Sequence, residues 1–160
     1  LTPGGREVFG GGGIVPDFFV PLDTARWTAF LTDLSWTGIL RDAAFGFVDA
    51  NRFELEAFAT PALLTLSIQE RALDHLLAEA ASAGWEARGL GRAERDQIAH
   101  RFMAQVIRNV FGEEGYHAHL AGQDPTVGKA LNLLKHVSHL VVVDGRLTLP
   151  VNSTTSNENI

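Results

Sequence analysis

Histidines are the side chains of this sequence whose spacing is closest to that of a metal site. His117 and His119 lie two residues apart, which places both side chains on one face of a strand or in a loop. His136 and His139 lie three apart, which on a helix gives one half of a two-histidine site. A catalytic zinc site needs a third ligand and usually a carboxylate base, and the sequence has no HExxH motif. We therefore expect surface histidines near helix C-termini, where the helix dipole favours their charge, and no metal site.

Nucleophilic catalysis has equally little support in these residues. The sequence contains no cysteine, no GxSxG motif and no SxxK motif. Ser138 follows Lys135 by three residues, the reverse of the SxxK order, and we expect both side chains to meet solvent. Paired carboxylates are typical of solvated helix ends and select no reaction; they occur at Glu113 and Glu114 and at Glu54 and Glu56. We predict no catalytic residue in this sequence.

Four consecutive glycines, Gly10 to Gly13, raise the question of a phosphate-binding loop. Such a loop follows a strand and opens a helix whose free backbone N–H groups bind the phosphate. Here Ile14-Val15-Pro16-Asp17 follows instead, and Pro16 has no N–H. We therefore expect a tight turn or bulge and no bound cofactor.

The composition is that of an ordinary globular domain. The 160 residues are 46% hydrophobic and 20% charged, with a net charge of −6, and this length buries a sizeable core without disulfides. Nineteen acidic residues outnumber thirteen basic ones, so no basic stripe is available for nucleic acid. The apolar runs are far shorter than the roughly 18 residues that span a membrane. We expect neither nucleic-acid binding nor a membrane span.

The first 23 residues differ from the remainder in composition and in hydrophobic pattern. Apolar pairs alternate there with glycine and proline, which predicts short strands and turns. From residue 24 alanine, leucine and glutamate recur at helical spacing, and residues 151–160 are polar and typical of a disordered tail. The expected organisation is therefore strands in residues 1–23, a helical domain in 24–150 and a tail in 151–160. Because Leu1 replaces the usual methionine, we expect a processed product or a fragment of a longer chain.

Apolar periodicity and capping signals predict five helices. Their expected limits are Asp23 or Thr24 to Gly38, Leu40 to Thr60-Pro61, Ser67 to Gly84, Arg92 to Phe111, and Asp124 to Val137. Ser67 to Glu70 matches a capping box, and a residue before proline is biased away from the helical region. Asp144-Gly145 between two apolar runs predicts a hairpin over 140–149. The expected class is mainly α, a bundle of about five helices with short N-terminal strands and a small C-terminal hairpin.

The glycine-rich segment GREVFGGGGIVPD, residues 5–17, closely resembles the "GR.V.GGGGI.PD" segment of the C-terminal processing peptidases, also called tail-specific proteases. A looser similarity continues through residues 47–52, 108–112 and 124–131, which look like the longer C-terminal extension of Bacteroidetes-type members. The glycine segment is the more specific of these marks. The resemblance covers roughly residues 2–134.

The resemblance implies a serine endopeptidase of the cell envelope or periplasm. In this family a lysine-activated serine attacks a peptide carbonyl, an acyl-enzyme forms and water hydrolyses it, and a PDZ domain helps to recognise unstructured C-terminal tails. No metal or organic cofactor takes part. The serine and lysine both precede the glycine segment in the family, so the resemblance assigns no catalytic residue to this sequence.

Residues 1–23 would then be the trailing strands of the protease core. Their apolar side chains would need burial against the helices or against another chain; these are Phe9, Ile14, Phe18, Phe19 and Val20. The leading hypothesis is the C-terminal helical region of such a peptidase, inactive alone, which braces the core or mediates self-association. Protein substrates would bind through upstream domains. Two alternatives remain open: a free-standing helical protein-interaction module, and a metal-dependent enzyme that uses the histidines.

Overall fold

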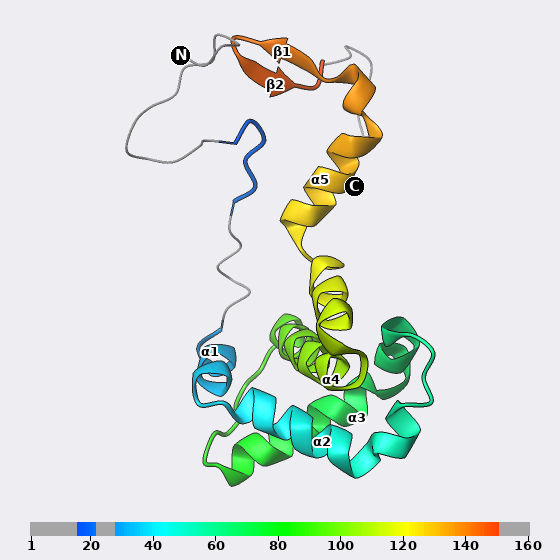
Figure 1. The fold of residues 1–160 in the computed structure, drawn as a ribbon. Helices are drawn as coiled ribbons and strands as arrows, with labels where there is room; N and C mark the ends of the chain where they lie inside the picture. The colour runs from blue at the N-terminus through cyan, green and yellow to red at the C-terminus, as the bar shows by residue number, and fades with distance from the viewer. Residues whose placement is uncertain (1–15, 22–27, 151–160) are drawn as a thin grey trace. The chain divides into compact units, whose positions relative to one another are not determined.

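The computed structural model of the protein describes residues 16–21 and 28–150. Within them lie five α-helices and one two-stranded antiparallel hairpin (Figure 1). The elements are α1 (Ala29–Trp36), α2 (Ile39–Leu55), α3 (Pro61–Ser82), α4 (Arg92–Ala121), α5 (Pro125–Lys135), a short 3-10 helix η2 (Val137–His139), β1 (Val141–Val143) and β2 (Arg146–Thr148). The mainly helical class and the C-terminal hairpin are confirmed.

These residues divide into two compact units. Residues 28–124, with α1 to α4, form one unit, and residues 16–21 and 125–150, with α5 and the hairpin, form the other. Over the described ranges, no helix has the length and apolar character that a membrane crossing requires.

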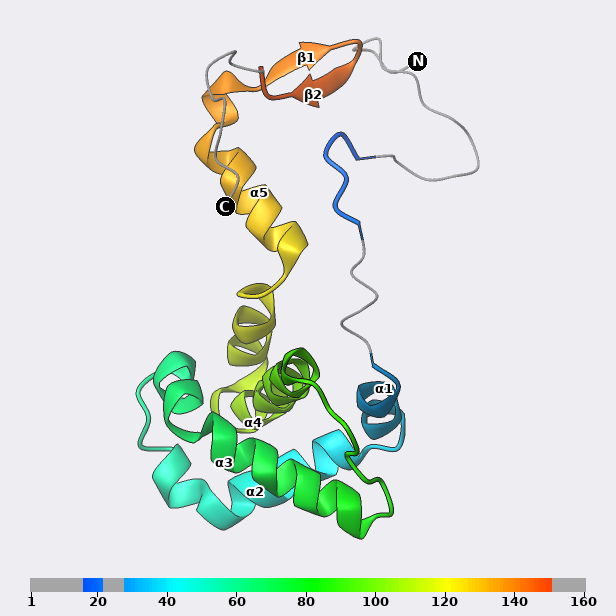
Figure 2. The same cartoon turned by 180° about the vertical axis from the view of Figure 1, so that it is seen from behind.

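One apolar core holds the four helices of residues 28–124 together. α4 contacts both α2 and α3, these two contact each other, and α1 contacts α2. Figure 1 shows α4 above the pair formed by α2 and α3, and Figure 2 shows the same helices from behind. The largest fully buried side chains include Phe102, Met103, Leu64 and Leu76. Burial of each such side chain contributes roughly 1.5–3 kcal/mol, so the apolar stripes of α2, α3 and α4 stabilise this unit.

The first helix begins later than expected. Thr28 is its N-cap, with extended backbone angles, and the Thr28 hydroxyl accepts a hydrogen bond from the Leu31 N–H at 3.3 Å. The expected caps Asp23 and Thr24 lie outside the described residues. Thr28 has the same capping chemistry as Thr24, and only packing distinguishes the two in advance.

The expected boundary between the second and third helices is wrong. α2 ends at Leu55, and Thr60-Pro61 begins α3 instead of ending α2. The Thr60 hydroxyl accepts from the Leu63 N–H at 3.3 Å, and Pro61 lies in the first turn, where a missing N–H costs nothing. Ser67, the expected cap, is an exposed residue inside α3. The buried Leu64 extends the apolar stripe upstream, and its packing favours helix over the local capping box.

The fourth helix continues past the expected end at Phe111. It runs to Ala121 and is interrupted at Gly112, whose φ of 76° and ψ of −169° are not helical. A side chain at this φ is strained, so glycine suits the position. Figure 1 shows α4 changing direction at this break, which makes it two straight segments.

The second unit contains a helix with no buried side chain. α5 begins at Pro125 as expected, and Leu131 and Leu134 on it are exposed. Val141 pairs with Thr148 and Val143 with Arg146 in the hairpin. Asp144 and Gly145 at the turn have φ of 50° and 75°, as a type I′ turn requires, so the expected Asp-Gly hairpin is confirmed.

The expected N-terminal strands are not seen in the described part of the chain. Residues 16–21 include Phe18 to Val20 but form no strand. Pro16 and Pro21 flank this short stretch, and proline cannot donate to a sheet. The Lys129 ammonium lies 5.9 Å from the centre of the Phe18 ring, and Phe19 is exposed. The remaining residues of the expected strands, 1–15 and 22–23, and the expected tail, 151–160, lie outside the described residues.

Candidate functional site

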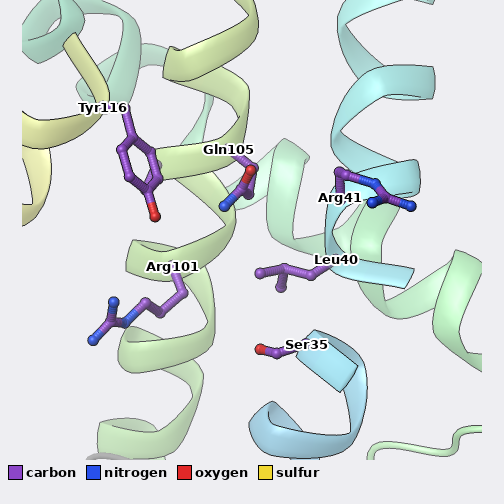
Figure 3. A pocket seen from close by; sticks show the side chains of 7 residues that line it. Ser35, Leu40, Arg41, Arg101, Gln105 and Tyr116 are labelled. Carbon is purple, nitrogen blue, oxygen red and sulfur yellow. The ribbon is translucent and has the colours of Figure 1, made fainter. Parts of the chain in front are cut away.

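A hollow of about 200 Å³ lies between α1, α2 and α4 in the helical unit. Ser35 and Leu40 border it from α1 and α2, and Arg101, Gln105 and Tyr116 border it from α4. Figure 3 shows Ser35 and Leu40 facing Gln105 across this space, with Tyr116 and Arg101 on the α4 side. The guanidinium groups of Arg41 and Arg101 both point away from Leu40 in this view. Its lining is therefore mixed, with a short apolar wall and several polar groups.

The polar groups of the hollow are two arginines, which only donate hydrogen bonds, and three hydroxyl or amide side chains, which both donate and accept. Arg101 and Arg41 bring positive charge, and none of the described residues that line the space is acidic, although the whole chain has a net charge of −6. Arg41 is occupied by Asp42, with its Nε 3.0 Å from the Asp42 Oδ1. The Gln105 amide and the Tyr116 hydroxyl have no hydrogen-bond partner among residues 16–21 and 28–150. Ser35 donates its hydroxyl to the Leu31 carbonyl at 2.8 Å.

The break at Gly112 positions Tyr116. Beyond it the second segment of α4 packs against the first: Gly115 is buried, and a Cβ there would lie 2.8 Å from the Cβ of Phe111 and 3.1 Å from the Cγ2 of Ile107. Arg108 bonds across the break through its Nε to the Oε1 of Glu113 at 2.6 Å. The Arg108 guanidinium also lies 5.4 Å from the centre of the Tyr116 ring. The glycine contact and the arginine together fix the tyrosine at the edge of the hollow.

Two histidines stack between the same segments. The rings of His100 and His119 are 4.4 Å apart between centres, and the His119 Nε2 donates to the His100 carbonyl oxygen at 3.2 Å. His100 is buried and His119 is half-buried. Burial lowers the pKa of His119 below its ordinary value of 6.5, because the charged ring loses water, and the bond to the carbonyl opposes this shift. His119 is therefore a neutral contact of the fold at neutral pH.

A third histidine is half-buried and lies beside α2. His75 of α3 has its ring centre 5.3 Å from that of Phe47. Its Nε2 is buried and has no hydrogen-bond partner among the described residues. Its contact in the described part of the chain is with the aromatic ring of Phe47, so we assign His75 a packing role.

The histidines whose spacing raised the question of a metal site lie apart from further ligands in the described part of the chain. His117 and His119 lie on a helix, not on a strand or loop, and a separation of two places them on different faces. His117 is exposed, with its Nε2 3.8 Å from the Glu113 Oε2. The rings of His136 and His139 are exposed, with centres 6.4 Å apart. Over residues 16–21 and 28–150, no group of three or more histidine, cysteine, aspartate or glutamate side chains is arranged to hold a metal ion.

The remaining candidates are surface groups. Ser138 in η2 and Lys135 at the end of α5 are both exposed. The paired carboxylates bond to different arginines: Glu54 to Arg71 at 2.7 Å, and Glu56 to Arg52 at 3.4 Å. The glycine run Gly10 to Gly13 lies outside the described residues.

Sequence reasoning did not single out the residues around the hollow. Gln105 and Arg101 lie between the apolar pairs of the predicted fourth helix, where polar residues are expected to face solvent. Tyr116 follows Gly112, beyond the expected end of that helix, although it is the sole tyrosine in the sequence. A prediction that the helix resumes after Gly112 would have placed Tyr116 near Arg101.

Comparison with known proteins adds no assignment. No protein-family model, no curated protein and no solved structure matches this chain.

Proposed function

We propose that this chain is the C-terminal region of a carboxyl-terminal processing serine peptidase of the cell envelope. The proposal rests on one observation, the segment GREVFGGGGIVPD at residues 5–17. In the parent enzyme a serine and a lysine upstream of this segment would cleave protein tails through an acyl-enzyme. The 160-residue chain would be inactive by itself.

The looser marks of the resemblance fall at changes in the backbone, which supports the proposal. Residues 47–52 include Asn51, whose φ of −121° is not helical and whose Nδ2 donates to the Phe47 carbonyl at 2.8 Å. Residues 108–112 end at the break in α4, and residues 124–131 contain the start of α5 at Pro125. Positions of this kind restrict the residue type, so a shared residue there is more informative than one on an open helix face.

The proposed role of the helical region is to brace the protease core or to mediate self-association. Large apolar side chains on its surface support such a contact: Phe53 is 95% exposed, and Trp36 and Leu66 are also exposed. The same exposed side chains fit the second candidate, a free-standing helical module that binds another protein.

The reading frame upstream of Leu1 tests the proposal directly. We expect it to encode a PDZ-like stretch and a serine followed by a lysine, and its absence would remove the peptidase interpretation. The full-length protein should then cleave a reporter that ends in an unstructured C-terminal tail. Replacing the upstream serine by alanine should abolish cleavage, whereas the 160-residue chain alone should show none. Serine-dependent cleavage by the 160-residue chain would contradict the proposed position of the dyad.

A further inference from the structure

We infer that α5, η2 and the hairpin bind to the surface of an anionic phospholipid bilayer. The inference goes beyond the proposed function and does not depend on it, because every residue that it uses lies in the unit of residues 16–21 and 125–150. Binding of this kind places apolar side chains at the boundary between headgroups and lipid chains, and it needs no helix that crosses the bilayer.

Exposed apolar side chains are concentrated in this unit. Eight of the thirteen large apolar side chains that are exposed in the described part of the chain belong to it, although the helical unit contains most of the described residues. The eight are Phe19, Leu131, Leu134, Val137, Val141, Val142, Val143 and Leu147. α5 has no buried residue, and a two-stranded hairpin by itself is at most marginally stable in water. Such a concentration indicates a partner with an apolar surface.

α5 is an amphipathic helix with a positively charged polar face. Val127, Leu131 and Leu134 recur at spacings of four and three, which places them on one face of the helix. The same geometry places Lys129 on the opposite face and Lys135 at the border between the two. A lysine at such a border extends its ammonium to the headgroups while its hydrocarbon stem covers apolar surface. This combination is typical of helices that lie in the membrane interface.

The charge of this stretch favours an anionic bilayer. Residues 125–143 contain two lysines and two histidines and no acidic residue, whereas acidic residues outnumber basic ones in residues 28–124. Over residues 16–21 and 125–150 the cations are Lys129, Lys135 and Arg146, and the carboxylates are Asp17 and Asp144. The contact of Lys129 with the Phe18 ring, at 5.9 Å, leaves the charge of the ammonium in place. The positive stretch is therefore complementary to negatively charged headgroups.

A second copy of the chain fits this surface less well. Stable protein interfaces bury at least roughly 1,200 Å² in total, and the apolar stripe of an 11-residue helix supplies only a fraction of that area. α5 also has no carboxylate to pair with the lysines of a second α5. Protein interfaces depend mainly on tryptophan, tyrosine and arginine, whereas the large apolar residues of 125–150 are leucine and valine. A lipid surface needs neither a large matched area nor such residues.

Co-sedimentation of the 160-residue chain with lipid vesicles tests the inference. We expect binding to vesicles of phosphatidylcholine and phosphatidylglycerol in equal parts, and about tenfold weaker binding to vesicles of phosphatidylcholine alone. Added salt should weaken binding to the anionic vesicles. Equal binding to both kinds of vesicle, or binding to neither, would overturn the inference. Self-association that is lost in Leu134→Gln, without vesicle binding, would also overturn it and assign the surface to a second copy.

Substitutions connect the binding to α5. Leu134→Gln removes an exposed apolar side chain and should weaken binding to the anionic vesicles by about tenfold. Leu66→Gln is the matched control, because Leu66 is an exposed leucine of α3 in the helical unit, and its binding should be unchanged.

The positive charge is tested in the same way. Lys135→Gln should weaken binding by about fivefold, whereas Arg88→Gln removes an exposed cation of the helical unit and should have no effect. Circular dichroism verifies the fold of each variant. Equal weakening by the Leu134 and Leu66 substitutions would refute α5 as the element that binds the bilayer.

Discussion

The close approach of Gly115 to the first segment of α4 can be tested by adding one methyl group. In Gly115→Ala the new Cβ would lie 2.8 Å from the Phe111 Cβ and 3.1 Å from the Ile107 Cγ2. The Phe111 Cβ is attached directly to the backbone, so a side-chain rotation cannot relieve the shorter contact. Overpacking of this kind lowers the free energy of unfolding by about 1–3 kcal/mol, and the better helix propensity of alanine offsets up to about 1 kcal/mol of this loss. We expect a net loss of about 1–2 kcal/mol in the free energy of unfolding.

Gly46→Ala provides the matched control for this prediction. Gly46 is an exposed residue inside α2, and a Cβ there would meet nothing within 4 Å. The same substitution should therefore raise stability by about 0.5–1 kcal/mol. Urea unfolding followed by circular dichroism and by fluorescence of the half-buried Trp85 measures both changes. If Gly115→Ala were as stable as Gly46→Ala, the two segments of α4 would not be packed as described.

Three further predictions concern protonation, capping and the core. The pKa of His119 is lower in the folded state than in the unfolded state. As the pH falls through 6.5, the unfolded state therefore binds a proton before the folded state does. The free energy of unfolding should fall with the pH until the folded-state pKa is passed. His119→Gln should reduce this pH dependence in urea titrations and the exposed His117→Gln should not; an identical pH dependence in both variants would refute the assignment. Thr60→Ala should cost about 1 kcal/mol by removing the cap of α3, whereas Ser67→Ala should be neutral or slightly stabilising in the same unfolding assay. The reverse order would restore the capping box as the true start of the helix. His75→Leu should change stability by less than about 1 kcal/mol, because the buried Nε2 that it removes has no partner among the described residues. A loss above about 2 kcal/mol on thermal or urea unfolding would show that this nitrogen is bonded.

Apolar periodicity was sufficient for most of the helices because it reports burial directly. The spacing of Phe102, Val106 and Ile98 predicted a buried face of α4, and all three are fully buried. The Asp144-Gly145 turn was equally readable, because few residue pairs adopt positive φ at two successive positions. Both signals are local. A local signal is sufficient where one residue type fixes a turn or one apolar face of a helix is buried.

The errors arose where two local signals compete and tertiary packing decides between them. Thr60-Pro61 can end one helix or begin the next, and burial of Leu64 favours the beginning. Gly112 can end a helix or interrupt one, and the contact of Gly115 with Phe111 favours a helix that resumes. Neither contact is visible in a short window of sequence, since each depends on packing beyond the capping residues.

Whether α4 ends or resumes at Gly112 also determines whether the hollow exists. If α4 ended at Phe111, Tyr116 would have no defined place, and the α4 side of the hollow would lose its aromatic side chain. With the helix resumed, the change of direction at Gly112 places the tyrosine on the same side of the hollow as Arg101, and the Arg108 to Glu113 bond spans the break.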